Sequence, residues 1–380
     1  MPFDIVKLTS DDREELVDFI DLVFGLDFKL ILPRLYQPGD ECMSWQYAVK
    51  EQGRIRAAVG SFPMTYKVGE HKLEVIGIGN VAVHRDHRSK GYMKVLMNAA
   101  LESMSTKAID ISWLGGQRQR YQYFGYETCG TSHNFSLKQE SLKHTIPANY
   151  VPHFSFEPLA GQTTEIVDRA FDIFNSQPVH IERHREDFLT TLQTFQSVPH
   201  AIYDENRTMV GYLTARQGKI QELVLTNDAI FTDVLYSFSI TQNTKDFGLT
   251  LYPHETDKLA QASRICDYQR TESAGNFRVF NFANTVLALL KLKSNYLPLP
   301  DGDLVIGSDL FGGHEINISR GEISVTKTEK ASDIYVKGFD IYQVLFGNLP
   351  ISGFIQDGPK NKLILAWFPL QLSFPSQDHV

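Results

Sequence analysis

A short basic loop is the part of the sequence whose residue types point most directly to a ligand. Residues 81–97 read as a β-branched strand, a polar loop that contains Arg88 and Lys90, and an amphipathic helix that follows Gly91. The first amides of a helix carry the positive end of its dipole, and a glycine lets the backbone approach a ligand closely. The pattern predicts a site for an anion such as a pyrophosphate. A basic loop that only caps a helix would show the same residue types.

Hydrophobic periodicity predicts the elements that position this loop. Leu16, Phe19, Ile20 and Val23 recur with the spacing of one helix face, so the chain should open with an amphipathic helix. β-Branched and aromatic runs then predict strands, and Gly53 suits the tight turn of a hairpin. The elements expected after the first helix are a hairpin within 45–66, a strand over 74–83, a helix from Gly91, a strand over 109–114 and a short helix over 118–124.

The length of 380 residues predicts two or three domains. Prolines at 147, 152 and 158 argue against a sheet or a long helix there and indicate a linker. From Thr163 the order of helices and strands repeats the first region, which suggests a duplicated domain, and the last hundred residues show a third, α+β pattern. The expected domains are residues 1–145, 146–275 and 276–380. The fold class is therefore a multidomain mixture of α+β and α/β, with mixed sheets flanked by helices.

Composition excludes several classes of protein. Hydrophobic residues make up 42% and charged residues 22%, as in folded globular proteins, and the net charge of −8 argues against a nucleic-acid partner. Cys42, Cys129 and Cys266 lie far apart, which predicts neither a disulfide framework nor zinc and fits a reducing cytoplasm. The longest apolar run, 363–370, is too short for a membrane helix, so no membrane partner is expected.

Two motifs resemble those of the GNAT family of N-acetyltransferases. Arg88-Ser89-Lys90-Gly91-Tyr92-Met93 is similar to the family's acetyl-CoA loop, Arg/Gln-x-x-Gly-x-Gly/Ala, except that Met93 replaces a small residue. The stretch 121–127, YQYFGYE, resembles the second hallmark, a short helix that ends in an aromatic-Gly-aromatic turn. The resemblance implies acetyl-CoA as cosubstrate and no metal. The cofactor-binding residues that it implies are Val81, Ala82, Val83, Arg88, Ser89, Lys90, Gly91 and Tyr92.

The layout of the whole chain is similar to that of the Eis-like (enhanced intracellular survival) acetyltransferases. It would contain a complete GNAT domain, a degenerate GNAT-like domain and a C-terminal unit like the sterol carrier protein fold. The stretch 226–230, TNDAI, has no basic residue and no glycine, so we expect no CoA in the second domain. The resemblance implies small amine substrates, such as aminoglycosides, polyamines or lysine, and a homo-oligomer, a hexamer.

The resemblance also implies the catalytic groups. Tyr126, directly after the Phe124-Gly125 turn, would be the general acid that protonates the departing thiolate. The α-carboxylate of Val380 would be the general base, and the apolar run 366–375 before it fits a docked tail. The alternatives are a core aromatic role for Tyr126 and a frayed chain end. Asp378, His379 or water are further candidates for the base.

Substrate contacts are the least specific part of the pattern. Asp27, Phe28 and Trp45 are the candidates, since a carboxylate and flat aromatic rings suit a cationic amine. A solvated helix face would account for Asp27 equally well. His84 and His87 flank the loop, but no third ligand has suitable spacing, which argues against a metal. The competing functions are a protein lysine acetyltransferase and a non-catalytic protein that senses acetyl-CoA or binds lipid through its C-terminal domain.

Overall fold

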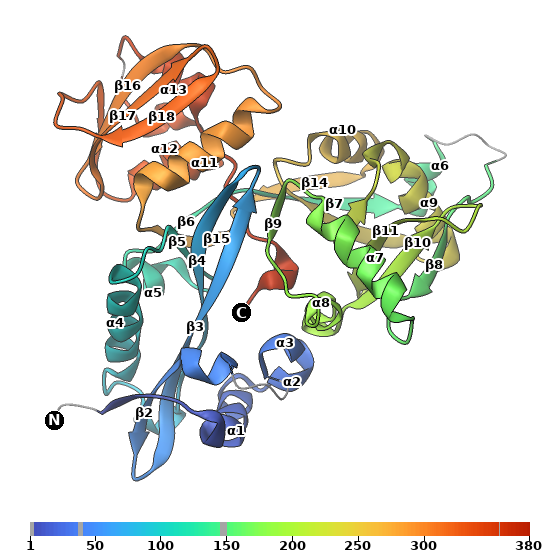
Figure 1. The fold of residues 1–380 in the computed structure, drawn as a ribbon, viewed down its shortest axis with the longest axis horizontal. Helices are drawn as coiled ribbons and strands as arrows, with labels where there is room; N and C mark the ends of the chain where they lie inside the picture. Colours follow the sequence, from blue (N-terminus) through green and yellow to red (C-terminus); the bar gives the residue numbers. More distant parts are fainter. Residues whose placement is uncertain (1–3, 37–40, 145–149, 357) are drawn as a thin grey trace. The chain divides into compact units, whose positions relative to one another are not determined.

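The computed structural model describes residues 4–36, 41–144, 150–356 and 358–380. The contacts between residues divide the chain into two compact units, which are described separately (Figure 1). The first unit comprises residues 1–130, 273–374 and 379–380, and the second comprises residues 131–272 and 375–378. The expected boundary at residue 145 lies outside the described residues. The division into three domains, 1–145, 146–275 and 276–380, stays a prediction.

The main sheet of the first unit has the strand order β1-β2-β3-β4-β5-β15-β6. Only β4 and β5 are parallel neighbours along this path among the described residues. The strands are β1 (Ile5–Lys7), β2 (Gln46–Glu51), β3 (Arg54–Val68), β4 (His71–Val83), β5 (Ile111–Leu114), β6 (Glu127–Cys129) and β15 (Gly275–Val279). The helices of this part are α1 (Arg13–Phe24), α2 (Phe28–Ile31), α3 (Pro33–Tyr36), α4 (Tyr92–Ser105), α5 (Arg118–Gln122) and the 3₁₀ helices η1 (Ser10–Asp12), η2 (Glu41–Trp45) and η3 (Arg85–His87).

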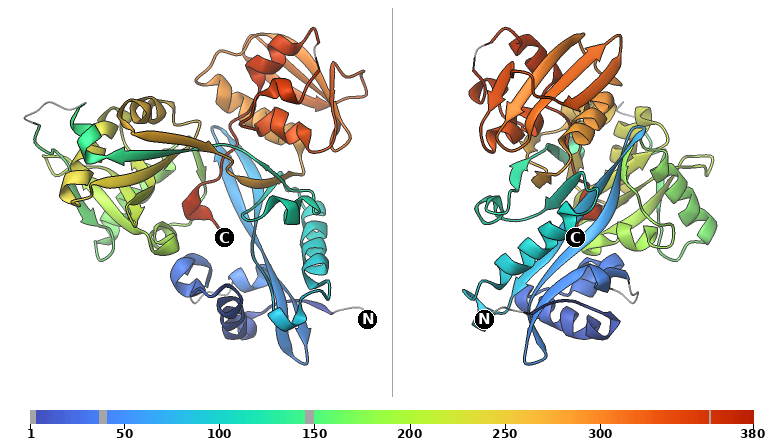
Figure 2. Two further views of the ribbon diagram at one scale, coloured as in Figure 1. Left: turned by 180° about the vertical axis from the view of Figure 1, so that it is seen from behind. Right: turned by 60° about the vertical axis from the view of Figure 1, so that its left-hand side comes forward.

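Helices cover both faces of this sheet (Figures 1 and 2). The helix α4 buries Leu96 and Met97 in one hydrophobic core with Ile76 and Ile78 of β4. Because side chains alternate along a strand, Gly77 and Gly79 belong to the opposite face of β4. The predicted amphipathic helix is α1, which also contacts β3 and β4.

The C-terminal part of the first unit forms its own four-stranded sheet with the order β18-β17-β16-β19. Ile316 and Ile318 alternate along β17, where both side chains are buried. The strands are β16 (Gly302–Ser308), β17 (Gly312–Ser319), β18 (Glu322–Lys327) and β19 (Ile334–Val336), and the helices are α11 (Phe282–Ser294), α12 (Asp340–Phe346), η6 (Ile351–Gly353) and α13 (Asn361–Trp367). The pattern is α+β as expected, while the likeness to a sterol carrier protein stays a prediction.

The second unit is built on a seven-stranded sheet with the order β14-β7-β13-β12-β11-β10-β8, in which β12 and β13 are parallel. The strands of this sheet are β7 (Ser132–Lys138), β8 (Ser155–Pro158), β10 (Val198–Tyr203), β11 (Met209–Arg216), β12 (Lys219–Leu225), β13 (Asp246–Leu251) and β14 (Tyr268–Glu272). The unit also contains the short strand β9 (Val179–Ile181), which is not part of this sheet. Its helices are α6 (Gln139–Lys143), α7 (Thr164–Asn175), α8 (Phe188–Leu192), α9 (Phe231–Thr241), α10 (Thr256–Ile265) and the 3₁₀ helices η4 (Thr194–Gln196), η5 (Asp228–Ile230) and η7 (Ser376–Asp378).

Both units thus contain mixed sheets flanked by helices, which is the predicted fold class. Across the described residues, no helix combines the length and the apolar character needed to span a bilayer.

Candidate active site

The parallel strands β4 and β5 of the main sheet diverge at their C-terminal ends. β5 pairs with β4 from Val75–Ile111 to Ile78–Leu114, where β5 ends. β4 continues through a bulge at Asn80, which has a φ of 40°, to Val83. Among the described residues, β5 therefore offers no ladder partner to Val81, Ala82 and Val83. Backbone donors left free at a diverging strand can hydrogen-bond an extended ligand and its carbonyl oxygen.

The basic loop follows this strand end directly. Arg88, Ser89, Lys90 and Gly91 are all exposed, and α4 begins at Tyr92, whose side chain is buried in the core. Ser89 and Gly91 have φ values of 65° and 84°, a conformation that glycine adopts without strain. A Cβ added to Gly91 would meet no atom within 4 Å, so the backbone here faces open space. These residues fit a pyrophosphate at the N-terminus of α4.

Tyr126 is fully buried, with 0% of its surface exposed, in the core between β4 and α4. Its hydroxyl lies 2.7 Å from Ser112 Oγ, which donates a hydrogen bond to the carbonyl of Ile76. Because the Ser112 hydroxyl has one proton and directs it to Ile76, Tyr126 donates to Ser112. Burial raises the pKa of Tyr126 above its usual value. The phenol is therefore protonated at neutral pH, as a general acid must be, although a core aromatic would also be.

The C-terminal residue lies against β4. A Cβ placed on Gly79 would lie 2.5 Å from the carboxyl carbon of Val380, and one on Gly77 would lie 2.7 Å from its Cγ2. The two glycines therefore make the space that the last residue occupies. Trp113 of β5, which pairs with Gly77, stacks on Phe374 with a centroid distance of 4.4 Å. The end of the chain is docked and not frayed.

The other candidates for the base are placed differently. Asp378 belongs to the second unit, where its carboxylate is engaged by Arg183. The His379 ring lies 4.4 Å from that of Trp113, and burial lowers the pKa of His379 to about 4. A histidine with that pKa is neutral at pH 7 and is a weak proton acceptor. The carboxylate of Val380 is the group best placed at the diverging strands.

The candidate acid and base approach β4 from opposite faces. Tyr126 and Ser112 belong to the face covered by α4, whereas Val380 lies over Gly77 and Gly79 on the other face. A thioester held along the strand end between them would have a proton donor on one side and a proton acceptor on the other. That is the arrangement required when an amine attacks a carbonyl and expels a thiolate.

The three candidate substrate residues have different surroundings. Trp45 is half-buried and packs edge-on against Phe62, whose ring would lie 3.1 Å from a Cβ on Gly79. Phe28 is buried and packs against Phe24 and Tyr36. Asp27 is exposed, and its carboxylate accepts a hydrogen bond from the amide of Leu30. Trp45 thus contacts Phe62, which borders the surface under Val380, while the contacts of Phe28 and Asp27 support the short helix α2.

Several residues of the site were not singled out from the sequence. They are Ser112, Trp113, Gly77 and Gly79. The two glycines carry a readable signal, because alternate glycines within a β-branched strand indicate that another group approaches one face closely. Ser112 and Trp113 carry none, since they are two ordinary residues of a buried strand.

The described part of the chain contains no group of three His, Cys, Asp or Glu side chains that could hold a metal ion. Cys129 is buried, and burial raises the pKa of its thiol, so the thiol stays protonated and is a poor nucleophile at neutral pH.

Comparisons with known proteins concern the N-terminal domain and the fold. Residues 4–129 match the sequence model of a family described as acetyltransferase (GNAT) domain. No curated protein matches the chain. Among solved structures, a GCN5-related N-acetyltransferase from Kribbella flavida has a TM-score of 0.72 at 15% identity and covers 100% of this chain and 98% of its own. A protein of unknown function from Enterococcus faecalis V583, a probable N-acyltransferase, has a TM-score of 0.72 at 14% identity, with 100% of both chains covered.

A third similar structure is Eis1 from Mycobacterium abscessus, with a TM-score of 0.67, 13% identity and coverage of 99% of this chain and 100% of its own. At such identities the structural likeness establishes the fold over the whole chain. The family match concerns the N-terminal part, residues 4–129. The chain contains a GNAT acetyltransferase domain over residues 4–129 and is an enzyme of the GNAT N-acetyltransferase type.

Proposed function

We propose that this enzyme transfers the acetyl group of acetyl-CoA to primary amines of small cationic compounds, with aminoglycosides, polyamines and lysine-like amines as the substrate classes. The observation that carries the proposal is the carboxylate of Val380 above Gly79, where β4 and β5 diverge. A negative charge at this point attracts an ammonium group and can accept its proton.

The cosubstrate is proposed to be held by the strand end and the loop after it. Amides around Ser89, Gly91 and Tyr92 face the pyrophosphate, and Arg88 and Lys90 add positive charge. The backbone of Val81–Val83 orients the thioester, and its amides stabilise the oxyanion that forms on the carbonyl oxygen.

The chemical step then uses two groups of this chain. The carboxylate of Val380 takes a proton from the ammonium, and the amine nitrogen forms a bond to the acetyl carbon. When the carbon–sulfur bond breaks, the thiolate takes the proton of Tyr126, the nitrogen gives its second proton to solvent, and solvent returns a proton to the Tyr126 phenolate. The raised pKa of Tyr126, caused by burial, keeps that proton available at neutral pH. Ser112 holds the phenol in place.

The selection of an amine is proposed to rest on the same face of β4. Trp45 packs against Phe62, which borders Gly79, so an aromatic wall lies beside the carboxylate. Aromatic faces and a carboxylate together suit a cationic group. Asp27, at the N-terminus of α2, is a second negative charge in this N-terminal region.

The test is release of CoA thiol from acetyl-CoA with a panel of polyamines, aminoglycosides and lysine peptides, against a blank without amine. We expect release with at least one small primary amine and a product that carries one acetyl group by mass spectrometry. Release with lysine peptides or proteins alone would favour the protein lysine acetyltransferase. Release with no acceptor would contradict both. A homohexamer is also proposed from the Eis-like layout, and light scattering tests it.

A further inference from the structure

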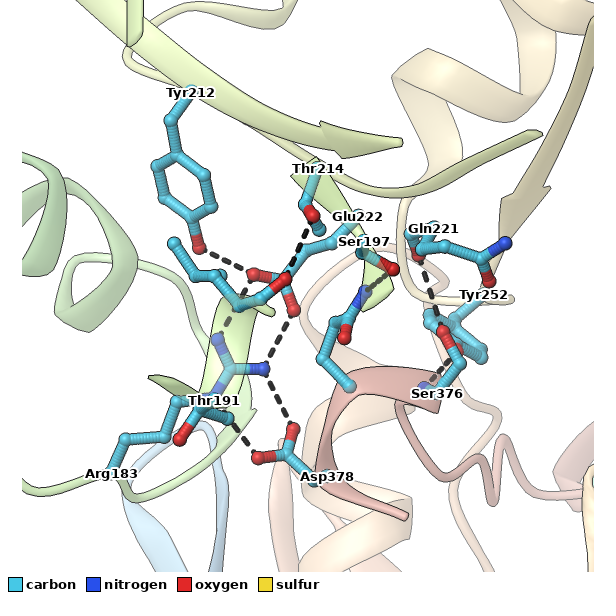
Figure 3. A network of polar contacts seen from close by, with 12 residues as sticks. Arg183, Thr191, Ser197, Tyr212, Thr214, Gln221, Glu222, Tyr252, Ser376 and Asp378 are labelled. Carbon is cyan, nitrogen blue, oxygen red and sulfur yellow. Dashed lines mark hydrogen bonds and ion pairs between the residues drawn. The ribbon is translucent and has the colours of Figure 1, made fainter. Parts of the chain in front are cut away.

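A buried ion-pair network in the second unit holds the segment just before the chain end (Figure 3). The guanidinium of Arg183 donates from Nε and Nη2 to the two carboxylate oxygens of Asp378, at 3.0 and 2.8 Å. It also donates from Nη1 and Nη2 to Glu222, at 3.0 and 2.7 Å. The side chains of Arg183 and Asp378 are each 2% exposed. The pairing is bidentate and almost free of solvent.

Every residue from 376 to 378 has a partner in the second unit. The amide of Ser376 donates to the hydroxyl of Tyr252 at 3.0 Å, and Gln377 Nε2 donates to Ser197 Oγ at 3.4 Å. Asp378 binds Arg183 as described. Figure 3 shows these contacts around the short helix η7. The segment is therefore fixed by directional bonds, which specify one position along the chain.

The electrostatics of this network favour a role in position over a role in stability. Burial opposes the charge on Arg183, but Asp378 and Glu222 outweigh it and raise its pKa. The hydroxyl of Tyr212 donates a hydrogen bond to Glu222 Oε1 at 2.6 Å. This bond satisfies part of the hydrogen-bonding capacity of the second carboxylate that contacts Arg183. Buried ion pairs stabilise folds little compared with apolar groups of the same size, and in some proteins they instead fix a unique register.

We propose that Arg183 is a positioning residue for the C-terminal carboxylate. Asp378 is the last residue of the second unit, and the two residues that follow it, His379 and Val380, belong to the first. Two residues of extended chain span at most about 7 Å, so fixing Asp378 confines the carboxylate to a small volume. The inference rests on the proposed function, because it matters for turnover only if that carboxylate is the base.

The test uses two variants of the network and one matched control. Arg183→Met removes the guanidinium. Asp378→Asn removes the negative charge that Arg183 binds, while the side chain keeps nearly the same size. It is the variant to use if Arg183→Met does not fold. The control is Arg185→Met, because Arg185 is half-exposed and pairs with Asp168 and Asp172 of α7 in the same unit. Binding of CoA by calorimetry verifies that each variant is folded.

The first readout does not depend on activity. Carboxypeptidase is added to the full-length protein, and the loss of Val380 is followed by mass spectrometry. We expect both network variants to lose Val380 at least about tenfold faster than the wild type and the Arg185→Met control to match the wild type. Equal rates for all four proteins would overturn the inference, whatever the identity of the base.

The second readout is a kinetic cycle with a chain extended by two glycines after Val380, which displaces the carboxylate. We expect Arg183→Met to lower kcat at least about tenfold, with the KM for acetyl-CoA within about twofold, and to cause no further loss in the extended chain. The kcat of Arg183→Met should also rise with pH in proportion to the unprotonated fraction of the amine substrate. If the extension lowers kcat while Arg183→Met does not, the positioning role is wrong and the proposed base stands. If the extension has no effect, the proposed base is wrong.

Discussion

The parallel strand pairs β4–β5 and β12–β13 share a topology but differ in the loops and charges at their diverging ends. In the first unit, β4 leads to an exposed basic loop with Gly91, and the backbone of Val81–Val83 extends beyond β5. In the second unit, β12 and β13 pair only at Lys219–Gly248 and Ile220–Leu249 before they part. There Lys258 is buried and donates a hydrogen bond to the backbone carbonyl of Leu223 of β12.

In the region between β12 and β13, the basic side chains are paired with acidic ones. A cavity of about 130 Å³ is lined by Glu222, Asp228 and Glu255 together with Arg183 and Lys258, which form ion pairs with these carboxylates. In the loop that follows β12, the side chain of Asn227 accepts a hydrogen bond from the amide of Ala229. The topology therefore provides the opening in both units, and from the difference in loop and charges we expect CoA to bind in the first unit alone.

The largest expected effect concerns the buried phenol of the first unit. Tyr126→Phe removes the proposed acid, and kcat should fall about 100- to 1,000-fold with acetyl-CoA affinity unchanged, in line with losses of general acid catalysis. Steady-state kinetics and calorimetry measure the two quantities. The matched control is Tyr342→Phe, a second buried phenol, which accepts a hydrogen bond from the amide of Val279. Equal turnover in Tyr126→Phe and the wild type would eliminate the acid.

The glycine of the basic loop gives the next effect. Gly91→Asp places a side chain at a φ of 84° and a negative charge beside the proposed phosphates, so acetyl-CoA should bind about 30- to 100-fold more weakly. Calorimetric titration gives the affinity. Ala229→Asp, in the loop of the second unit, is the control and should change nothing. Weaker binding in the control would place CoA in the second unit and remove the distinction between the two loops.

The acid side of the stability profile tests the docking of the tail. The pKa of His379 is lowered to about 4 in the folded state, so between pH 6.5 and 4 the unfolded chain binds more protons. The free energy of unfolding should therefore fall as pH decreases through this window, by up to about 2 kcal/mol from this group at pH 5. Urea unfolding at pH 7 and pH 5 measures the loss. It should be smaller in His379→Gln, and an equal loss would show that the tail is not docked.

A smaller effect on the KM for acetyl-CoA distinguishes a phosphate contact at Arg88 from a general effect of net charge. Arg88→Ala should raise the KM for acetyl-CoA about fivefold, because an exposed charge that meets a phosphate contributes about 1 kcal/mol. Arg207→Ala, which removes an exposed arginine paired with Glu157 in the second unit, should leave the KM unchanged. Equal changes of this KM in both variants would indicate an effect of net charge and would contradict a phosphate contact at Arg88.

The local features of the fold could be predicted from the sequence. The strand, loop and helix around Gly91 follow from β-branched runs, glycine and 3.6-residue periodicity, which act over short distances. The sequence could not show that β15, from residues 275–279, lies between β5 and β6 in the first unit. Strand order depends on contacts between distant segments, and alternation along a strand does not name its neighbour.

The same limit applies to the candidate site. Tyr126 and the loop follow from motifs, whereas the hydrogen bond of Tyr126 to Ser112 and the pairing of Arg183 with Asp378 join residues that are 14 and 195 positions apart. The sequence pattern predicted a docked tail from its apolar character. It could not predict that Gly77 and Gly79 form the surface under Val380, because only the folded chain brings these segments together.

The turnover of the chain extended by two glycines after Val380 is the decisive measurement for the proposed base. The extension leaves the strand end, the basic loop and Tyr126 intact and only moves the terminal carboxylate. With a small primary amine at neutral pH, we predict a fall in kcat of at least about 100-fold, with the KM for acetyl-CoA within about twofold of the wild type. A kcat equal to that of the wild type would contradict the assignment of the chain end as the base.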